Sequence, residues 1–165
     1  MAPPRVTAQA SMIGLDMSEE ARPDQSIRFS VSNDLKNIGF CRDRIDAICN
    51  EHDVPRKIVY AVNLSVDELL TNIITHGYRD SDTHEIGLAV RLSDNEIIVE
   101  IDSDGIPFDP TAGEMPDLRA RLQERPIGGL GIPFVRELMD RFTYRRENGR
   151  NVLTLVKETG ASTGV

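Results

Sequence analysis

The feature that most limits the fold is a pair of extended apolar segments that lie close together in the chain. Residues 84–92 and 96–101 are rich in Ile and Val, and they alternate apolar with polar side chains as half-buried strands do. Only Ser93, Asp94 and Asn95 separate the two segments, and so short a connection joins antiparallel strands. We therefore expect a β-hairpin in the middle of the chain, whose apolar side must be covered by other elements.

Two other parts of the chain carry strand signals. Residues 26–32 alternate apolar and polar side chains, which predicts a further half-buried strand. Residues 142–146 and 151–156 flank Asn148-Gly149, a dipeptide typical of tight hairpin turns. The chain should therefore end in a second hairpin.

Apolar residues spaced three and four apart predict three helices. The first follows a cap at Asn33 or Asp34 and ends near His52. The second covers 54–77, with a proline in its first turn, and the third covers 132–140. Packed on one face of a mixed, mostly antiparallel sheet, these helices would give an α/β two-layer sandwich.

The rest of the chain sets the expected domain limits. Residues 1–25 have no sustained apolar period and are expected to be a flexible tail, as are residues 159–165. One domain then covers 26–158. Residues 106–127 contain several prolines and no strong period, so we expect a functional loop such as a lid, with a short helical turn at 118–122.

Composition narrows the classes of function. The chain has 165 residues and a net charge of −8, which makes nucleic acid a poor partner, although backbone N–H groups and a metal ion can still hold a nucleotide. Cys41 and Cys49 lie eight apart, which is neither a metal-ligand nor a redox spacing, so both are expected in the core. We find no signal sequence and no apolar stretch of about 20 residues, and we expect a soluble, cytoplasmic protein with no membrane contact.

The first candidate for chemistry is a polar stripe on the second helix. In the segment ELLTNIITHGY, residues Glu68, Asn72 and His76 are spaced by four and share one helix face. An Asn amide oxygen suits Mg²⁺, and a Glu one turn away can accept a proton from a hydroxyl. The alternative is a solvated helix face, and this segment alone does not decide between them.

Two glycine-containing segments are further candidates. Residues 102–110, DSDGIPFDP, follow a strand and open the long loop, where a glycine allows close approach of the backbone to a ligand. Residues 125–132, RPIGGLGI, precede the third helix, where amide N–H groups and the helix N-terminus favour phosphate. An acidic turn and a flexible hinge are the structural alternatives.

In this order and at these separations, the three segments resemble the N, G1 and G2 boxes of the GHKL (Bergerat-fold) ATPase superfamily. The most specific pieces are ELLTNIITHGY, GIPFDP and GGLGIPFVRELMD, with NVLTLVK as the closing strand. Within the superfamily, the chain is most similar to the bacterial anti-sigma factor serine/threonine protein kinases. The resemblance covers roughly residues 26–157 and implies a histidine-kinase-like ATPase fold.

The resemblance implies two cofactors, ATP and Mg²⁺. Glu68 matches the catalytic Glu that activates an acceptor serine, and Asn72 matches the Mg²⁺-binding Asn. Gly105 matches the glycine beside the adenine. His76 and Tyr78 match the end of the N box, where they are expected to be mainly structural.

The implied phosphate contacts come from the segment before the third helix. Gly129 and Gly131 match lid glycines whose amides contact phosphates, and Gly128 and Leu130 belong to the same run. Arg125 stands where a lid Arg reaches the phosphates.

One position departs from the family pattern. Ser103 stands where the family usually has the Asp that binds the adenine amino group, and Asp102 and Asp104 flank it. Neighbouring side chains on a strand point to opposite faces, so Ser103 either makes the base contact itself or the local backbone is shifted. Weaker ATP binding or looser base selectivity is the expected consequence.

The function implied is that of an anti-sigma regulatory factor in a partner-switching system. Such a kinase phosphorylates a serine of an anti-sigma factor antagonist of STAS type, binds a sigma factor and forms a homodimer. One alternative is a detached histidine-kinase ATP-binding domain, although none of His52, His76 and His84 lies in a phosphoacceptor helix pair. The other is a nucleotide-sensing, protein-binding module without transfer activity.

Overall fold

The computed structural model describes residues 25–113 and 131–160. The two expected tails therefore lie almost wholly outside the described residues. The same is true of the helical turn expected at 118–122 and of most of the expected lid.

The described chain contains five strands, three α-helices and one 3₁₀ turn, and their order is the one expected. Their bounds are β1 Gln25–Ser32, η1 Leu35–Asn37, α1 Ile38–Glu51, α2 Arg56–His76, β2 Glu85–Leu92, β3 Glu96–Ser103, α4 Gly131–Leu138, β4 Arg141–Glu147 and β5 Arg150–Glu158.

The start of the first helical segment matches the cap expected at Asp34. The Asp34 carboxylate accepts a hydrogen bond from the backbone N–H of Lys36, with an N–O distance of 2.9 Å. The first turn after this cap is a 3₁₀ turn, a common start for an α-helix. The preceding residue, Asn33, instead joins β1 to the start of β2, because its N–H donates to the carbonyl of His84.

The strands form one sheet in the order β1-β2-β3-β5-β4. All four pairings in the described part are antiparallel, which corrects the expectation of a mixed sheet. β3 precedes α4 in the chain and β4 follows it, and the two strands run in the same direction, as strands joined by a helical crossover do. However, β5 turns back from β4 at Asn148-Gly149, where both residues have positive φ, and lies between them.

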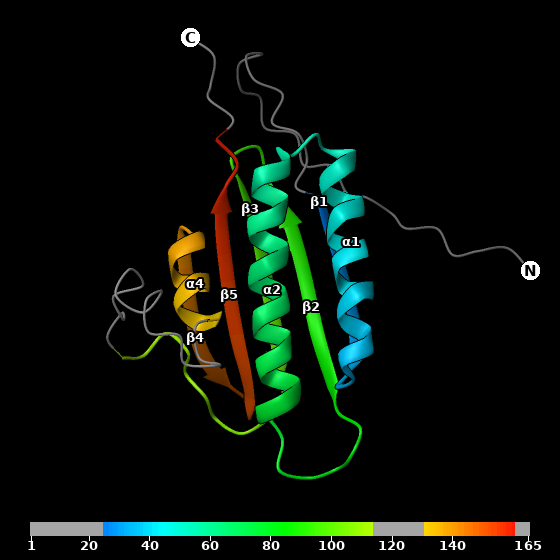
Figure 1. Cartoon of the computed structure of the whole chain (residues 1–165), viewed down its shortest axis with the longest axis vertical. Helices are drawn as coiled ribbons and strands as arrows, with labels where there is room; N and C mark the ends of the chain where they lie inside the picture. The colour runs from blue at the N-terminus through cyan, green and yellow to red at the C-terminus, as the bar shows by residue number, and fades with distance from the viewer. Residues whose placement is uncertain (1–24, 114–130, 161–165) are drawn as a thin grey trace, which may run out of the picture.

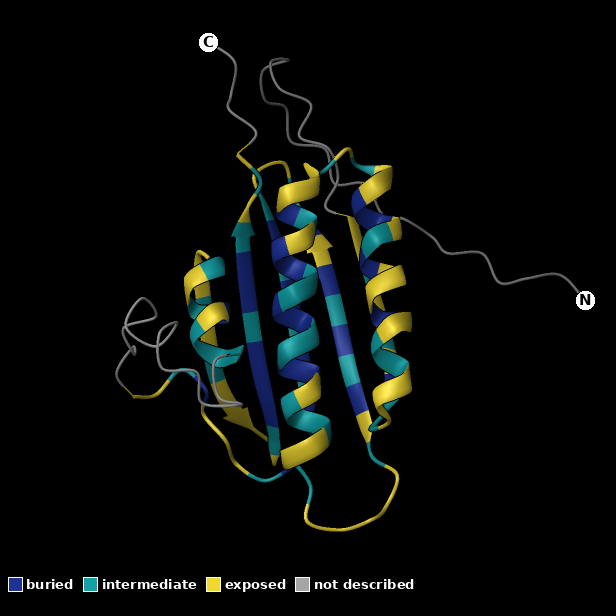
Figure 2. Cartoon of the chain, viewed as in Figure 1, coloured by how far each residue is buried: buried dark blue, intermediate teal, exposed yellow. Residues whose placement is uncertain are grey.

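The three helices cover one face of the sheet, as Figure 1 shows, so the predicted two-layer sandwich is confirmed. α2 lies over the middle of the sheet, with α1 and α4 on either side of it. Figure 2 shows buried residues along β2 and β5 and on the inner sides of α1 and α2, whereas the edge strand β4 is largely exposed.

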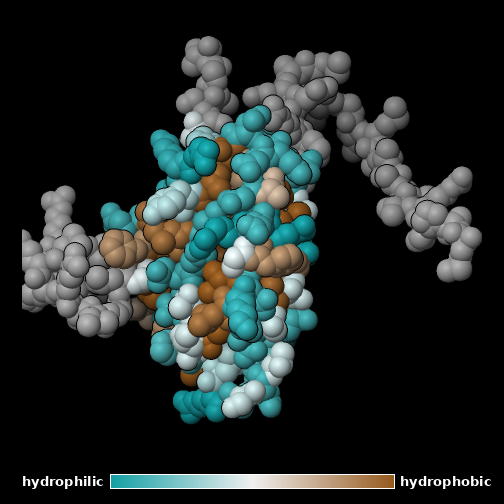
Figure 3. All heavy atoms as spheres, turned by 45° about the vertical axis from the view of Figure 1, so that its right-hand side comes forward, coloured by the Kyte–Doolittle hydropathy of each residue, from teal (hydrophilic) through white to brown (hydrophobic). Residues whose placement is uncertain are grey.

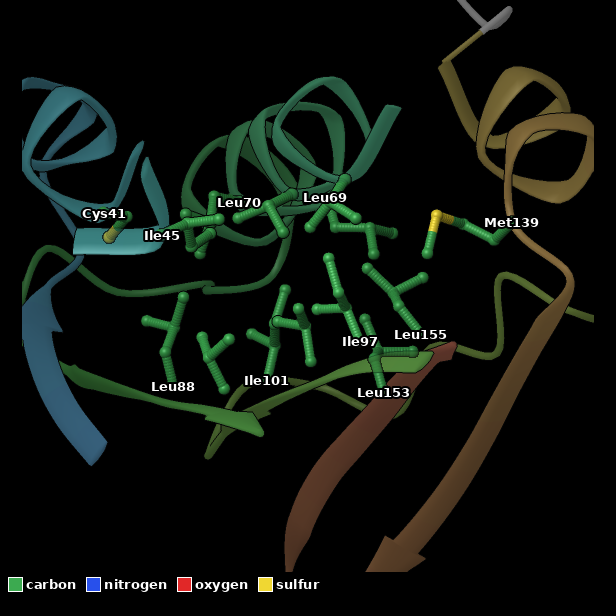
Figure 4. Close-up of a cluster of buried hydrophobic side chains, with 14 of the residues drawn as sticks. Cys41, Ile45, Leu69, Leu70, Leu88, Ile97, Ile101, Met139, Leu153 and Leu155 are labelled. Atoms are coloured by element: carbon green, nitrogen blue, oxygen red, sulfur yellow. The ribbon is translucent and has the colours of Figure 1, made fainter. Parts of the chain in front are cut away.

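The core lies between the helices and the sheet, and Figure 4 shows side chains from both layers pointing into it. Burying a large aliphatic side chain contributes about 1.5–3 kcal/mol, so this layer is the main source of stability. Cys41 and Cys49 on α1 are fully buried, as expected, and burial raises the pKa of both thiols to about 11. The labelled core residues are Cys41, Ile45, Leu69, Leu70, Leu88, Ile97, Ile101, Met139, Leu153 and Leu155.

Helix α2 is long and largely apolar. Its 21 residues contain a window with mean hydropathy 1.2, which meets the length and composition expected of a membrane span, contrary to the sequence-based expectation. Half of that window is buried inside the fold, as expected for a central core helix. Figure 3 shows hydrophilic and hydrophobic residues interspersed over the face of the molecule that it draws.

Candidate functional site

The polar stripe on α2 lies where the helix leaves the core. Leu69 and Leu70 on the same helix are fully buried, whereas Glu68 and Asn72 are half-buried and His76 is exposed. The stripe is therefore open to a ligand on one side and supported by packed leucines on the other. This arrangement confirms that the three side chains share a face.

Glu68 meets the start of α4. A Cβ atom built on Gly131, the first residue of that helix, would overlap the Glu68 carboxylate oxygen Oε2. A larger residue at 131 would therefore require the Glu68 side chain to move. The close approach brings the predicted catalytic Glu and one of the predicted phosphate-contacting glycines together, although they are far apart in the sequence.

A pocket of about 200 Å³ opens beside Asn72. It lies where the C-terminal end of α2, the end of β3, the following loop and the start of β5 meet. The pocket thus joins the first two segments singled out in the sequence. Its lining residues are Asn72, Ile73, His76, Gly77, Ser103, Ile106, Phe108, Asn151 and Leu153.

Strand alternation decides which residue of 102–104 reaches this pocket. Ser103 points to the helix side of β3, is 2% exposed and lines the pocket. Asp102 points to the opposite face, where it lies over Gly87 and accepts a hydrogen bond from Arg150 Nε at 2.6 Å. Asp104 does not line the pocket but faces His84. The backbone is therefore not shifted in a way that would bring the carboxylate of Asp102 or Asp104 into the pocket in place of Ser103.

Gly105 is required by a close contact between two elements. The N–H of Ile106 donates to the carbonyl of Gly77 at 2.8 Å, which draws the loop after β3 against the end of α2. A Cβ atom on Gly105 would overlap that same carbonyl and contact the ring of Tyr78. Gly105 is buried and does not itself line the pocket, although its neighbour Ile106 does, so its predicted role beside a base stays a prediction.

Asn151 is a site residue that the sequence analysis missed. It is 8% exposed and lies directly opposite Ser103 in the β3–β5 register. Its amide donates to the carbonyls of Gly105 and Ile106, at 3.3 and 2.8 Å, and so holds the loop at the pocket mouth. Since Asn151 sits in an ordinary-looking strand after a turn, only the strand pairing identifies it.

A second polar cluster lies behind this loop. The rings of Tyr78 and His84 are stacked with centroids 4.1 Å apart, and burial raises the pKa of the Tyr78 hydroxyl to about 12. His84 bridges Asp80 through Nε2 at 2.7 Å and Asp104 through Nδ1 at 3.2 Å. These two hydrogen bonds, with Asp80 the stronger, raise the pKa of His84. The cluster supports the mainly structural role expected for Tyr78.

Several predicted phosphate contacts cannot be placed. Arg125, Gly128, Gly129 and Leu130 lie outside the described residues, and of the segment 125–132 only Gly131 and Ile132 are described. Within residues 25–113 and 131–160, no group of three His, Cys, Asp or Glu side chains could hold a metal ion by itself. Magnesium at Asn72 therefore stays a prediction, and it fits an ion that takes most of its ligands from phosphates and water.

The pocket and the stripe together suit a nucleotide. Flat apolar surfaces from Ile73, Ile106 and Leu153 can contact the faces of a base, and Ser103 supplies a polar group at the floor. Asn72 and Glu68 then lie along α2, where a phosphate chain with its metal ion would extend towards the start of α4. The residues present thus fit both ATP and Mg²⁺.

Comparison with curated proteins gives relatives named as protein kinases and as anti-sigma factors. Serine/threonine-protein kinase BtrW of Bordetella bronchiseptica is 30% identical over 103 residues, which are 62% of this chain and 72% of the relative. Anti-sigma F factor of Clostridium acetobutylicum is 23% identical over 74% of this chain and 85% of its own length. Serine-protein kinase RsbW of Halalkalibacterium halodurans is 23% identical over 76% of this chain and 78% of its own length.

A model of one protein family matches most of the chain. The match covers residues 31–157, and the family is described as the histidine kinase-like ATPase domain. It includes every described residue of the pocket and of the stripe on α2. The chain therefore belongs to the family of histidine kinase-like ATPase domains.

Proposed function

We propose that this protein is an ATP-dependent serine/threonine protein kinase that acts as an anti-sigma regulatory factor. Its substrate would be a serine of an anti-sigma factor antagonist of STAS type, and it would also bind a sigma factor. The names of the relatives, a serine/threonine-protein kinase, an anti-sigma F factor and a serine-protein kinase, support both halves of this proposal. Partner switching of this kind takes place in the cytoplasm, and the protein would act there as a homodimer.

The observation that carries the kinase proposal is the placement of Glu68. It lies one turn before Asn72 on α2, is half-buried, and touches the start of α4. A base in this position can reach a hydroxyl that approaches the end of a phosphate chain held along the helix. A module that only sensed nucleotide would not need a carboxylate there.

The proposed reaction is in-line transfer of the γ-phosphoryl group. The serine oxygen of the antagonist forms a new bond to the γ-phosphorus, and the bond from that phosphorus to the β–γ bridging oxygen breaks. Glu68 accepts the proton of the serine hydroxyl, and ADP leaves with the electron pair of the broken bond. Asn72 would hold a Mg²⁺ ion, which would neutralise charge on the phosphates.

The histidines support this proposal over a detached histidine-kinase domain. His52 ends α1 with its ring Nδ1 against the carbonyl of Ile48 at 2.8 Å, and His84 is held between two carboxylates. His76 lines the pocket at the end of α2. None of the three lies on a helix pair of the kind that presents a phosphoacceptor.

Two variants test the proposal in one experiment. Calorimetry with Mg-ATP should show binding to the wild type and at least about tenfold weaker binding to Asn72→Ala, since the variant loses a ligand to the metal. Glu68→Gln should bind Mg-ATP normally, but should phosphorylate the antagonist proteins of the same organism about 10²–10⁴-fold more slowly, because it lacks the base.

The outcomes separate the candidate functions. Binding of Mg-ATP without transfer to any antagonist serine would favour the nucleotide-sensing module over the kinase. Equal transfer by wild type and Glu68→Gln would contradict the role given to Glu68. Absence of Mg-ATP binding to the wild type would overturn the proposed function altogether.

A further inference from the structure

The pocket beside α2 offers few polar groups to a bound base. Within the described residues, its polar side chains are those of Asn72, His76, Ser103 and Asn151. Hydrogen bonds to its edge distinguish one base from another, so these four side chains are the candidates for reading a base in the described pocket.

Asn151 has no hydrogen-bonding capacity left for a ligand. Its two N–H groups donate to the carbonyls of Gly105 and Ile106, at 3.3 and 2.8 Å. Its Oδ1 accepts from Tyr144 Oη and from Arg146 Nη1, both at 2.8 Å. An amide has two donors and two acceptor sites, and all four are used. Asn151 therefore holds the loop that contains Gly105 and Ile106 and does not bond to the base edge.

Ser103 is the buried polar group that remains. It is 2% exposed, lines the pocket, and has no hydrogen bond from its hydroxyl to any other residue of the described part. A serine hydroxyl can donate one hydrogen bond and accept others, and it rotates to suit its partner. Ser103 can therefore accept from an amino group or donate to a carbonyl oxygen in the same place.

The two remaining polar side chains are poor discriminators of a base. His76 is exposed, so water competes for its hydrogen bonds. Asn72 lies on the same helix face as Glu68, one turn from it, at the end of the pocket assigned above to the metal and phosphates. Neither His76 nor Asn72 therefore presents a hydrogen-bond donor or acceptor in a fixed position against the base edge.

We propose that this pocket binds purine nucleoside triphosphates without distinguishing a 6-amino from a 6-oxo base, so that Mg-GTP binds alongside Mg-ATP. Adenine presents an amino donor at this position and guanine presents a carbonyl acceptor. The Ser103 hydroxyl satisfies either one by rotating. This inference rests on the proposed function, because it takes the ligand to be a nucleoside triphosphate.

Direct titration of the full chain tests the inference. With Mg-ATP and Mg-GTP measured separately by calorimetry, we expect dissociation constants within about tenfold of each other, since the Ser103 hydroxyl can bond to either 6-substituent and the other polar side chains of the described pocket do not read the base. Binding of Mg-ATP with Mg-GTP more than tenfold weaker would overturn the inference and leave the proposed function standing. Failure of both nucleotides to bind would overturn the proposed function, and the inference with it.

Variants at Ser103 test which residue reads the base. In Ser103→Asp a carboxylate that only accepts hydrogen bonds faces the base, so the preference for ATP over GTP should rise to more than about tenfold. Ser103→Ala is the matched control and should weaken both nucleotides about equally, with their ratio unchanged. An unchanged ratio in a folded Ser103→Asp protein would overturn the role of Ser103. If Ser103→Asp does not fold, the Ser103→Ala variant decides: a change of more than tenfold in its ratio of ATP to GTP dissociation constants would overturn the role of Ser103.

Discussion

Gly105, Gly131 and Asn151 bring the elements of the candidate site close together. Gly131 leaves room for the Glu68 carboxylate, and Gly105 lets the loop after β3 contact the end of α2. Asn151 then fixes that loop with two hydrogen bonds to its carbonyls. The two glycines act through the space that they leave, and Asn151 acts through its amide.

Substitution of Gly105 tests this view at the residue scale. In Gly105→Ala, the new methyl group would overlap the carbonyl of Gly77, so the loop must move and lose the hydrogen bond from Ile106 to that carbonyl. We expect a loss of about 1–3 kcal/mol in the free energy of unfolding, measured by urea denaturation.

The matched control is Gly39 in α1, where an added Cβ atom would meet nothing within 4 Å apart from its own helix backbone and chain neighbours. Gly39→Ala should raise the free energy of unfolding by up to about 1 kcal/mol, because alanine favours the helix. Equal effects of the two substitutions would contradict the contact described for Gly105.

At the scale of elements, the contact between the loop before β2 and the end of β3 depends on one histidine. His84 is held by Asp80 on its own loop and by Asp104 just after β3. Both carboxylates raise the pKa of His84 in the folded protein. The strength of this connection should therefore depend on pH.

The sign of that dependence follows from the raised pKa. The stabilisation by protonated His84 is fully present below its unfolded pKa of about 6.5 and is lost as pH rises through its higher folded pKa. Urea denaturation should show wild type more stable than His84→Gln at about pH 5.5, with a smaller difference at about pH 8.5. Asp80→Asn should reduce this pH dependence without abolishing it, since Asp104 remains. A difference that does not change with pH would contradict the raised pKa.

At the scale of the whole molecule, the core is built from residues well inside the described part. The buried cluster runs from Val31 to Leu155, and the sheet is completed by β1 at one edge and β4 at the other. A chain shortened to residues 25–160 keeps every one of these contacts. The domain expected over 26–158 should therefore fold by itself.

Thermal unfolding of the shortened chain checks this expectation. Its Tm should lie within about 2 °C of that of the full chain, because no described core contact is removed. Nucleotide binding should also be unchanged, since the pocket lies within the retained residues. A fall in Tm of more than about 5 °C would mean that residues 1–24 or 161–165 contribute to the packing.

The order and type of the helices and strands follow from local patterns in the chain. Alternation along 84–101 and the three- and four-residue spacing of α1 and α2 are local properties, and Asn148-Gly149 specifies its turn through the positive φ of both residues. The shared face of Glu68 and Asn72 follows from helix geometry alone. Such features need no information about distant parts of the chain.

Strand order and the hydrogen bonding of buried polar groups depend instead on contacts between distant parts of the chain. β5 lies between β3 and β4 and pairs antiparallel with both, so the described sheet is wholly antiparallel. This strand order depends on where the chain returns to the sheet after α4, which no local pattern specifies. The same pairing placed Asn151 opposite Ser103, where two side chains of β4 and two carbonyls of the loop after β3 satisfy all four hydrogen-bonding positions of its amide. No local pattern shows whether a buried polar group is already satisfied, since its partners come from strands and loops that only folding brings together.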